Sequence, residues 1–192
     1  MKHVFSRLRA TTLRAAVGMS PHDGRLRLRL GRALLLIGHT QSACRTLEQA
    51  VRLDPGCGES HFALGSALSA LGCLSEARVA FSRARRLAPG SAEVAFALGN
   101  VYFECGEIDL AVRAYESAIY MQPAYARAHF NLGHAFKENG RLVQAAAAFR
   151  KALISEPKFY KARFMLAYVY ALMDLNEEAI EEYRKTIHQS PT

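Results

Sequence analysis

Three regularly spaced arginines are the first residues in this sequence whose types and positions could bind a ligand. Arg25, Arg29 and Arg32 stand at i, i+4 and i+7, a spacing that places three guanidinium groups along one face of a helix. A guanidinium can bind a carboxylate or a phosphate through two parallel N–H groups. The stripe therefore predicts an anion-binding surface. The alternative is a solvated face that keeps a terminal segment soluble.

A second candidate surface combines phenylalanines with polar and basic residues. Phe62, Phe96, Phe130 and Phe164 recur at one constant interval. A surface with apolar and basic groups suits a peptide that carries acidic and hydrophobic residues. The alternative is that these phenylalanines only pack between neighbouring helices. The residues predicted to form the peptide-binding surface are Asn100, Arg127, Phe130, Asn131, His134, Lys161, Phe164 and Tyr168.

Catalytic and metal-binding patterns are absent from the sequence. Gly56-Cys57-Gly58 lies in a turn and is followed by Glu59, so it does not read as a dinucleotide-binding loop. There is no Gly-Lys pair of a phosphate loop and no Gly-x-Ser-x-Gly motif. The four cysteines form no Cys-x-x-Cys pair, which favours free thiols in a reducing compartment. We expect no enzymatic activity, no cofactor and no metal.

A tandem repeat organises the whole chain. All six prolines share one register, and columns of leucine, glycine, alanine and large apolar residues keep the same interval. A repeat of this length predicts a solenoid of helix pairs, in which each pair buries its apolar face against the next. The prolines are Pro21, Pro55, Pro89, Pro123, Pro157 and Pro191.

Each repeat contains two helical patterns separated by a turn. In one copy, apolar residues follow helical spacing from Glu93 to Cys105 and again from Asp109 to Met121. Asp109 is a candidate N-cap of the second helix. A glycine column at the end of the first helix predicts a left-handed residue there, with Asp174 replacing glycine in the last copy. A second glycine column, with Gly99 and Gly133, predicts close approach of the two helices in a pair.

These residues resemble the tetratricopeptide repeat. The resemblance rests on Leu98-Gly99, Tyr102, Gly106, Ala111, Tyr115, Ala118 and Pro123, and on the same columns in the other copies. It implies an all-α, right-handed superhelical solenoid of stacked antiparallel helix pairs, whose first helices line a concave, peptide-binding face. It also implies a basic N-terminal half repeat over residues 1–23, acting as a capping helix, and an array over 24–192. The five full repeats would be 24–57, 58–91, 92–125, 126–159 and 160–192.

The sequence departs from the family at one packing position. The family's usual tryptophan is replaced by Arg27, His61, Ala95, His129 and Arg163. We expect looser packing there.

Asn100, Asn131 and Lys161 also resemble part of the dicarboxylate clamp of some tetratricopeptide co-chaperones. Each stands one repeat, less about one helical turn, after the one before it, so the side chains can converge. Phe96 and Met165 stand where the family clamp has a lysine and an arginine. The resemblance therefore implies a peptide groove rather than a full clamp.

Charge is concentrated at the start of the chain. The net charge is +8, and the residues up to Leu47 hold nine Lys or Arg against one acid, Asp23. The first residues, rich in arginine, serine and threonine, also resemble a mitochondrial presequence. Because Pro21 lies in the repeat register, we expect these residues to belong to the array and the protein to be cytoplasmic. Mitochondrial import is the minor alternative.

These observations predict a non-enzymatic scaffold or adaptor that binds an acidic and hydrophobic segment of a protein partner. One alternative is binding of nucleic acid or another anionic surface through the basic N-terminal repeat, which would depend steeply on salt. Another is a substrate-recognition module within a larger enzyme. Acids on the last helix, against the basic first residues, also leave self-association open.

Overall fold

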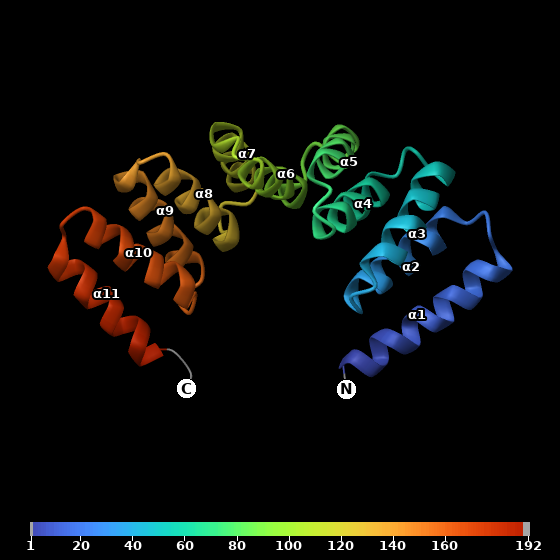
Figure 1. The fold of residues 1–192 in the computed structure, drawn as a ribbon, viewed down its shortest axis with the longest axis horizontal. Helices are drawn as coiled ribbons and strands as arrows, with labels where there is room; N and C mark the ends of the chain where they lie inside the picture. The colour runs from blue at the N-terminus through green and yellow to red at the C-terminus, as the bar shows by residue number, and fades with distance from the viewer. Residues whose placement is uncertain (1, 190–192) are drawn as a thin grey trace. The chain divides into compact units, whose positions relative to one another are not determined.

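Eleven α-helices and no β-strand make up the described part of the chain. The structure is a computed structural model that describes the backbone of residues 2–189 and the side chains of residues 7–187. The helices follow one another along the chain without other elements between them (Figure 1). They are α1 (Lys2–Met19), α2 (Gly24–Leu36), α3 (Thr40–Leu53), α4 (Gly58–Ala70), α5 (Leu74–Leu87), α6 (Ala92–Glu104), α7 (Ile108–Met121), α8 (Ala126–Glu138), α9 (Leu142–Ser155), α10 (Tyr160–Leu172) and α11 (Asn176–Gln189).

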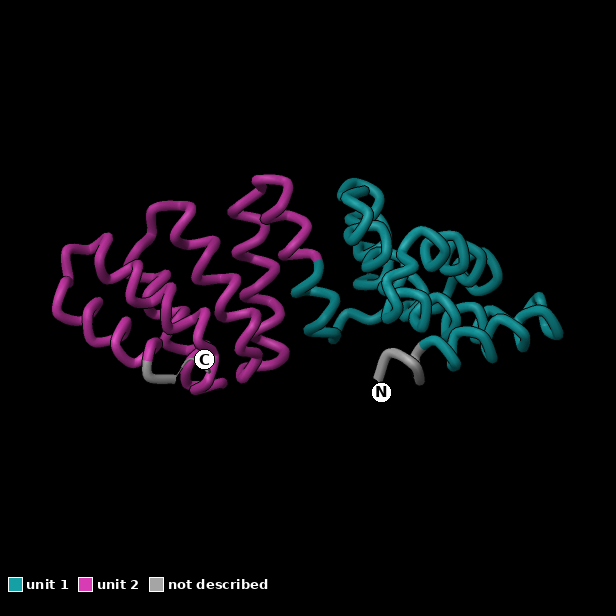
Figure 2. The backbone as a smooth tube through the Cα atoms, turned by 60° about the horizontal axis from the view of Figure 1, so that its bottom comes forward, with its two compact units in different colours: residues 1–97 teal, residues 98–192 magenta. Residues whose placement is uncertain are grey.

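The chain divides into two compact units, residues 1–97 and 98–192, with the boundary inside α6 (Figure 2). In the first unit α2 packs with α3 and α4 with α5, and α3 joins the two pairs by packing on α4. In the second unit α8 packs with α9 and α10 with α11, and α9 packs on α10. Each unit is thus a stack of helix pairs. The predicted all-α solenoid of stacked pairs is confirmed.

Left-handed residues end the first helix of each pair, as predicted. Gly38, Gly72, Gly106 and Gly140 have φ values of 79, 78, 75 and 69°, and Asp174 has a φ of 60°. Glycine adopts this conformation without a steric cost, and aspartate is among the residues that tolerate it.

The predicted N-cap role of Asp109 is wrong. The helix begins at Ile108, so Asp109 lies inside its first turn. Its carboxylate instead accepts a hydrogen bond from the side-chain amide of Asn139 at 3.0 Å. This contact links the start of α7 to the end of α8.

The second glycine column allows the two helices of a pair to touch. A Cβ atom built on Gly133 would lie 2.7 Å from the ring of Phe149, and one on Gly99 would lie 2.5 Å from Tyr115. Both rings are fully buried. A methyl group has no room at such distances, so these positions need glycine for packing rather than for backbone freedom.

The position of the family's tryptophan carries a recurring hydrogen bond. The side chains of Arg27, His61, His129 and Arg163 each bond to the carbonyl oxygen of the proline six residues earlier, at distances between 2.7 and 3.2 Å. Ala95 has no polar group that could do so. The expected loose packing is wrong for His129, which is only 5% exposed. A polar contact fixes the turn that precedes each of these first helices.

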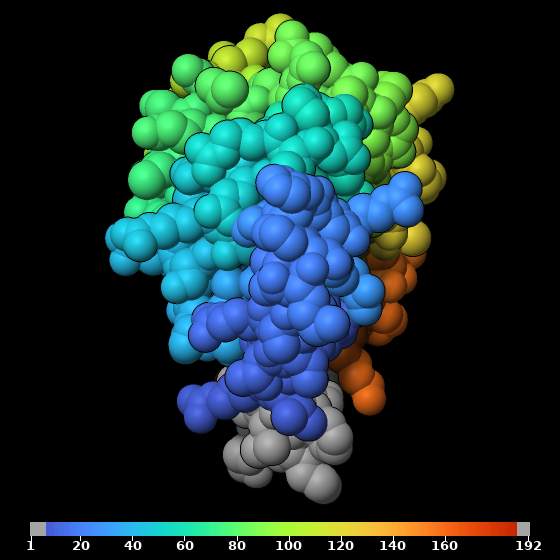
Figure 3. All heavy atoms as spheres, turned by 90° about the vertical axis from the view of Figure 1, so that its right-hand side faces the viewer, coloured from blue at the N-terminus to red at the C-terminus, as the bar shows by residue number. Residues whose placement is uncertain are grey.

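Helix α1 covers the first complete pair by packing on α2. Ala10 and Leu13 are buried in the core of the first unit. The opposite face of α1 lies open at the surface (Figure 3), and Arg7, Arg9 and Arg14 are exposed there. No helix in residues 2–189 is both long enough and apolar enough to cross a lipid bilayer.

Candidate functional site

Two asparagines and a tyrosine form a hydrogen-bonded group in the second unit. The Oδ1 atom of Asn100 accepts the hydroxyl of Tyr115 at 2.9 Å and the Nδ2–H of Asn131 at 2.7 Å. Burial raises the pKa of the Tyr115 phenol, so the hydroxyl stays protonated and donates. The interval between the two asparagines therefore does bring their amides together. The amide N–H groups of Asn100 have no partner among the described residues.

A polar pocket opens beside this group. It has a volume of about 380 Å³ and lies between the end of α6 and the middle of α8. The two asparagines and Tyr115 supply its polar side, and aromatic residues supply most of the rest. Its lining residues are Asn100, Phe103, Glu104, Tyr115, Phe130, Asn131 and His134.

A second, more apolar pocket adjoins the first and shares Phe130 and His134 with it. It has a volume of about 300 Å³, lies between α8 and α10, and reaches Thr186 on α11. Phe164, half exposed, forms part of its wall. Lys161 is the one cation on its lining and has no ion-pair partner among the described residues. The lining is Phe130, His134, Tyr160, Lys161, Phe164, Met165 and Thr186.

His134 lies where the two pockets meet. Its ring packs edge-on against Phe130 at 4.6 Å and Phe149 at 5.5 Å between centroids. Burial between these rings, and then the nearby Lys137 ammonium, lowers the pKa of the imidazole below its usual value. His134 is therefore neutral at pH 7, and it offers hydrogen bonds rather than a positive charge.

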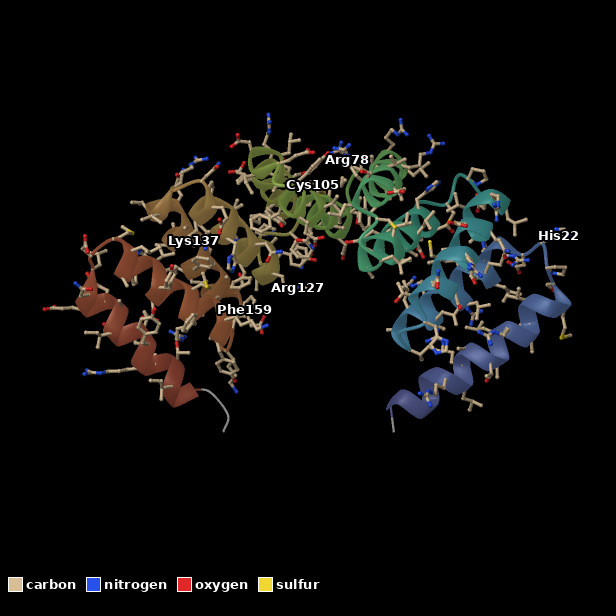
Figure 4. The ribbon with its side chains drawn as sticks, viewed as in Figure 1. His22, Arg78, Cys105, Arg127, Lys137 and Phe159 are labelled. Atoms are coloured by element: carbon tan, nitrogen blue, oxygen red, sulfur yellow. The ribbon has the colours of Figure 1, made fainter. Side chains whose placement is uncertain are left out.

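The remaining residues of the predicted surface lie outside the two pockets. Arg127 is exposed near the start of α8, and Tyr168 lies on α10 with its ring 5.9 Å from the Lys137 ammonium. Figure 4 labels Arg127, Lys137 and Phe159, and the ring of Phe159 packs on Phe130 at 4.8 Å.

The structure therefore divides the predicted surface between two places. It brings Asn100, Asn131, Phe130 and His134 to one pocket, and Lys161 and Phe164 to the next. The asparagine pair and Lys161 line different pockets.

The arginines of the predicted anion-binding stripe are in the first unit. Arg25, Arg29 and Arg32 are all exposed on α2. Arg32 lies 3.4 Å from the Glu59 carboxylate, in a pair whose side chains are 63% and 75% exposed. Arg32 also borders a larger pocket, of about 670 Å³.

Several lining residues were not predicted from the sequence. Glu104 sits in a column that varies in type, so nothing marked it as functional. Thr186 is the one departure from a column that is otherwise alanine, and this signal was not used. The pocket beside Arg32 has a signal that could have been found. Small residues, Ala63 and Ser66, stand on α4 where the fourth repeat has Asn131 and His134.

Comparison with known proteins agrees with this architecture. A family model described as TPR repeat matches residues 99–140, and one described as tetratricopeptide repeat matches residues 37–92 and 133–192. No curated protein matches the chain.

Solved structures of the same fold align over most of the chain. MamA from Desulfovibrio magneticus RS-1 is 25% identical with a TM-score of 0.80, and the alignment covers 86% of this chain and 94% of that one. YrrB, described as a TPR protein with an unusual peptide-binding site, is 20% identical with a TM-score of 0.76, covering 95% and 94%. PilF of Pseudomonas aeruginosa is 20% identical with a TM-score of 0.79, covering 91% and 79%. Family models that together match more than half of the sequence and a fold of regularly repeated, stacked helix pairs lead to one conclusion: this chain belongs to the tetratricopeptide repeat family.

Proposed function

We propose that the protein is a non-enzymatic scaffold that holds a peptide segment of a partner on the first helices of its second unit. The observation that carries the proposal is the pair of adjoining pockets that share Phe130 and His134. The tetratricopeptide fold generally serves as an interaction module. YrrB, which shares the fold, is described as having a peptide-binding site.

The two pockets offer complementary chemistry. Free amide N–H groups of Asn100 can donate to the backbone carbonyls of an extended peptide, and the Asn131 carbonyl can accept a backbone N–H. The apolar pocket can take a hydrophobic side chain between Phe130 and Phe164. Lys161, exposed at its edge, can pair with a carboxylate. We infer a ligand with a hydrophobic residue next to an acidic one.

Partner capture followed by matched variants tests this site. Proteins retained by the full chain are identified by mass spectrometry, and the binding of each is then measured with Asn131→Ala and Lys161→Ala. Loss of the amide contacts or of the cation should lower the affinity for a partner of this site about 5- to 20-fold.

The control is Lys158→Ala, which removes the same charge from an exposed residue that lines neither pocket. It should leave affinity unchanged. If Lys158→Ala weakens binding as much as Lys161→Ala, binding depends on overall charge and the proposed pockets are not the site.

A further inference from the structure

A larger pocket lies in the first unit and is independent of the site proposed above. About 670 Å³ in volume, it opens between α2, α4 and the beginning of α6. Most of its wall is apolar, from Leu35, Leu36, Phe62, Ala63 and Val94. Leu36, which is 67% exposed, extends this apolar lining to the surface.

Small side chains on α4 create the space. Ala63 and Ser66 occupy the repeat positions that Asn131 and His134 occupy on α8. In the second unit Asn131 lines the polar pocket and His134 lines both pockets. In the first unit the same positions carry only the small side chains of Ala63 and Ser66. The Ser66 hydroxyl donates to the carbonyl of Phe62 at 3.0 Å. The wall therefore presents little free polarity.

Some charged side chains around the pocket have an ion-pair partner and others do not. The Glu59 carboxylate pairs with Arg32 at 3.4 Å, and the Glu93 carboxylate accepts the Ser91 hydroxyl at 3.1 Å. Arg25 and Arg29 form no ion pair with any described residue. Arg25 lies about two turns and Arg29 about one turn before Arg32 on the same face of α2, a helix that contains no acid. Glu93 has no cation partner among the described residues, so two unpaired positive charges on α2 stand against one unpaired negative charge on the pocket lining. The excess charge beside the apolar pocket is positive.

We propose that this pocket and the arginine face of α2 form a second peptide-binding site, specific for a segment in which bulky hydrophobic residues adjoin carboxylates. A leucine or phenylalanine side chain would enter the space above Ala63 and Ser66. Acidic residues one or two helical turns away along the peptide would meet Arg29 and Arg25. The protein would then hold two segments of similar chemistry, one on each unit.

Two synthetic peptides test the charge requirement on the full-length chain. One carries leucine and phenylalanine flanked by glutamates, and the other has lysines in place of the glutamates, each with a fluorescent label for anisotropy. The acidic peptide should bind about tenfold or more tightly than the basic one, and its affinity should fall as salt is raised.

Variants separate the pocket from the arginines. Ala63→Asn combined with Ser66→His fills the pocket with the residues that the fourth repeat tolerates at the same positions. This double variant should lower the affinity for the acidic peptide about tenfold, because the peptide's large apolar side chain can no longer be buried there. Arg25→Gln with Arg29→Gln should weaken it about 3- to 10-fold. Circular dichroism melts establish that each variant is folded.

Asn131→Ala with Lys161→Ala is the control, because it alters only the second unit. Because the second unit is proposed to take a peptide of similar chemistry, the two peptides and the variants of the first unit are compared in this background. The acidic peptide should still bind there through the first unit, so this site can be refuted separately from the function proposed above. Equal affinity for the two peptides, or no effect of filling the pocket, would refute the proposal.

Two other outcomes would also refute it. If single-stranded RNA binds and the arginine variant abolishes this while the pocket variant does not, the arginines serve an anionic polymer. If sedimentation shows an oligomer that dissociates when the pocket is filled, and no peptide binds, the occupant is a second copy of the chain.

Discussion

In four of the five repeats, a polar side chain at the start of the first helix makes a hydrogen bond that an apolar residue cannot make. In the turn before the helix, no backbone N–H of the described residues bonds to the proline carbonyl, so the side chain supplies its donor. In the fourth repeat Nε2 of His129 lies 2.8 Å from the Pro123 oxygen. A carbonyl only accepts, so Nε2 carries a proton and donates it, while the buried Nδ1 has no partner among the described residues.

Replacing this histidine tests how much the contact stabilises the turn. His129→Leu keeps the volume approximately but leaves the Pro123 carbonyl without its donor, so we expect a loss of about 1–3 kcal/mol in the free energy of unfolding. His61→Leu removes the same contact at a less buried site and should cost less. Urea denaturation measures both. A His61 variant as damaged as the His129 variant would show that burial does not set the cost.

His134 makes stability depend on pH in a defined direction. Its pKa is lowered in the folded chain by burial and by Lys137, so the unfolded chain binds the proton first as the pH falls. Its contribution is complete above the ordinary histidine pKa of about 6.5 and is lost as the pH falls through the lowered folded value.

His134→Asn removes this titrating group. Asparagine is the residue that the preceding repeat has at the same position, Asn100. We expect the loss of stability between pH 7.5 and 5 to be smaller in the variant than in the parent, measured as urea midpoints. If the two pH profiles run parallel, the imidazole is not the group responsible.

Within the last helix pair, an ion pair links α10 to α11. Nη1 of Arg163 lies 2.9 Å from the Glu182 carboxylate, and the two side chains are only 13% and 14% exposed. Another N–H of Arg163 donates to the Pro157 carbonyl. The same guanidinium therefore holds both the preceding turn and the partner helix.

Glu182→Gln should loosen this pair because it leaves the guanidinium poorly compensated. We expect a loss of about 2–3 kcal/mol and faster hydrogen exchange of the α11 amides. Glu59→Gln, in the exposed pair with Arg32, should change stability by less than about 1 kcal/mol. Similar effects of the two substitutions would mean that burial does not distinguish the pairs.

Helix boundaries show how far a repeated sequence predicts its own structure. The pattern predicted helices from Glu93 to Cys105 and from Asp109 to Met121, and the observed helices begin one residue earlier. The repeat determines which residues face the pair's interior, so the left-handed turns and the glycine contacts followed directly. The N-cap prediction failed because a polar residue near a helix start has several possible partners. The Asp109 carboxylate accepts a hydrogen bond from the side-chain amide of Asn139 instead.

Pockets were harder to predict than helices because they depend on what neighbouring side chains leave unfilled. The convergence of Asn100 and Asn131 follows from spacing alone. The separation of Lys161 into the adjoining pocket does not, since it depends on the rings of Phe130 and His134 standing between. The pocket above Ala63 arises from absent atoms, which no pattern of residue types marks as a site.

At the scale of the molecule, stability should be distributed along the array. Within each unit, helix pairs contact the pairs next to them in sequence, and stability in such arrays is close to a sum of local terms. Each unit also carries its own pockets. A change confined to one unit should therefore alter that unit's binding and leave the other's intact.

Excising residues 126–159 tests both ideas at once, because removal of one whole repeat keeps every remaining column in register. We expect a shorter helical protein that unfolds cooperatively at a lower urea midpoint. It loses Phe130, Asn131 and His134, so partners of the second unit should no longer bind. The acidic, hydrophobic peptide should still bind the first unit with its original affinity in anisotropy titrations. A remnant that does not unfold cooperatively would contradict the additive array, and a matching loss of peptide affinity would contradict the independence of the two sites.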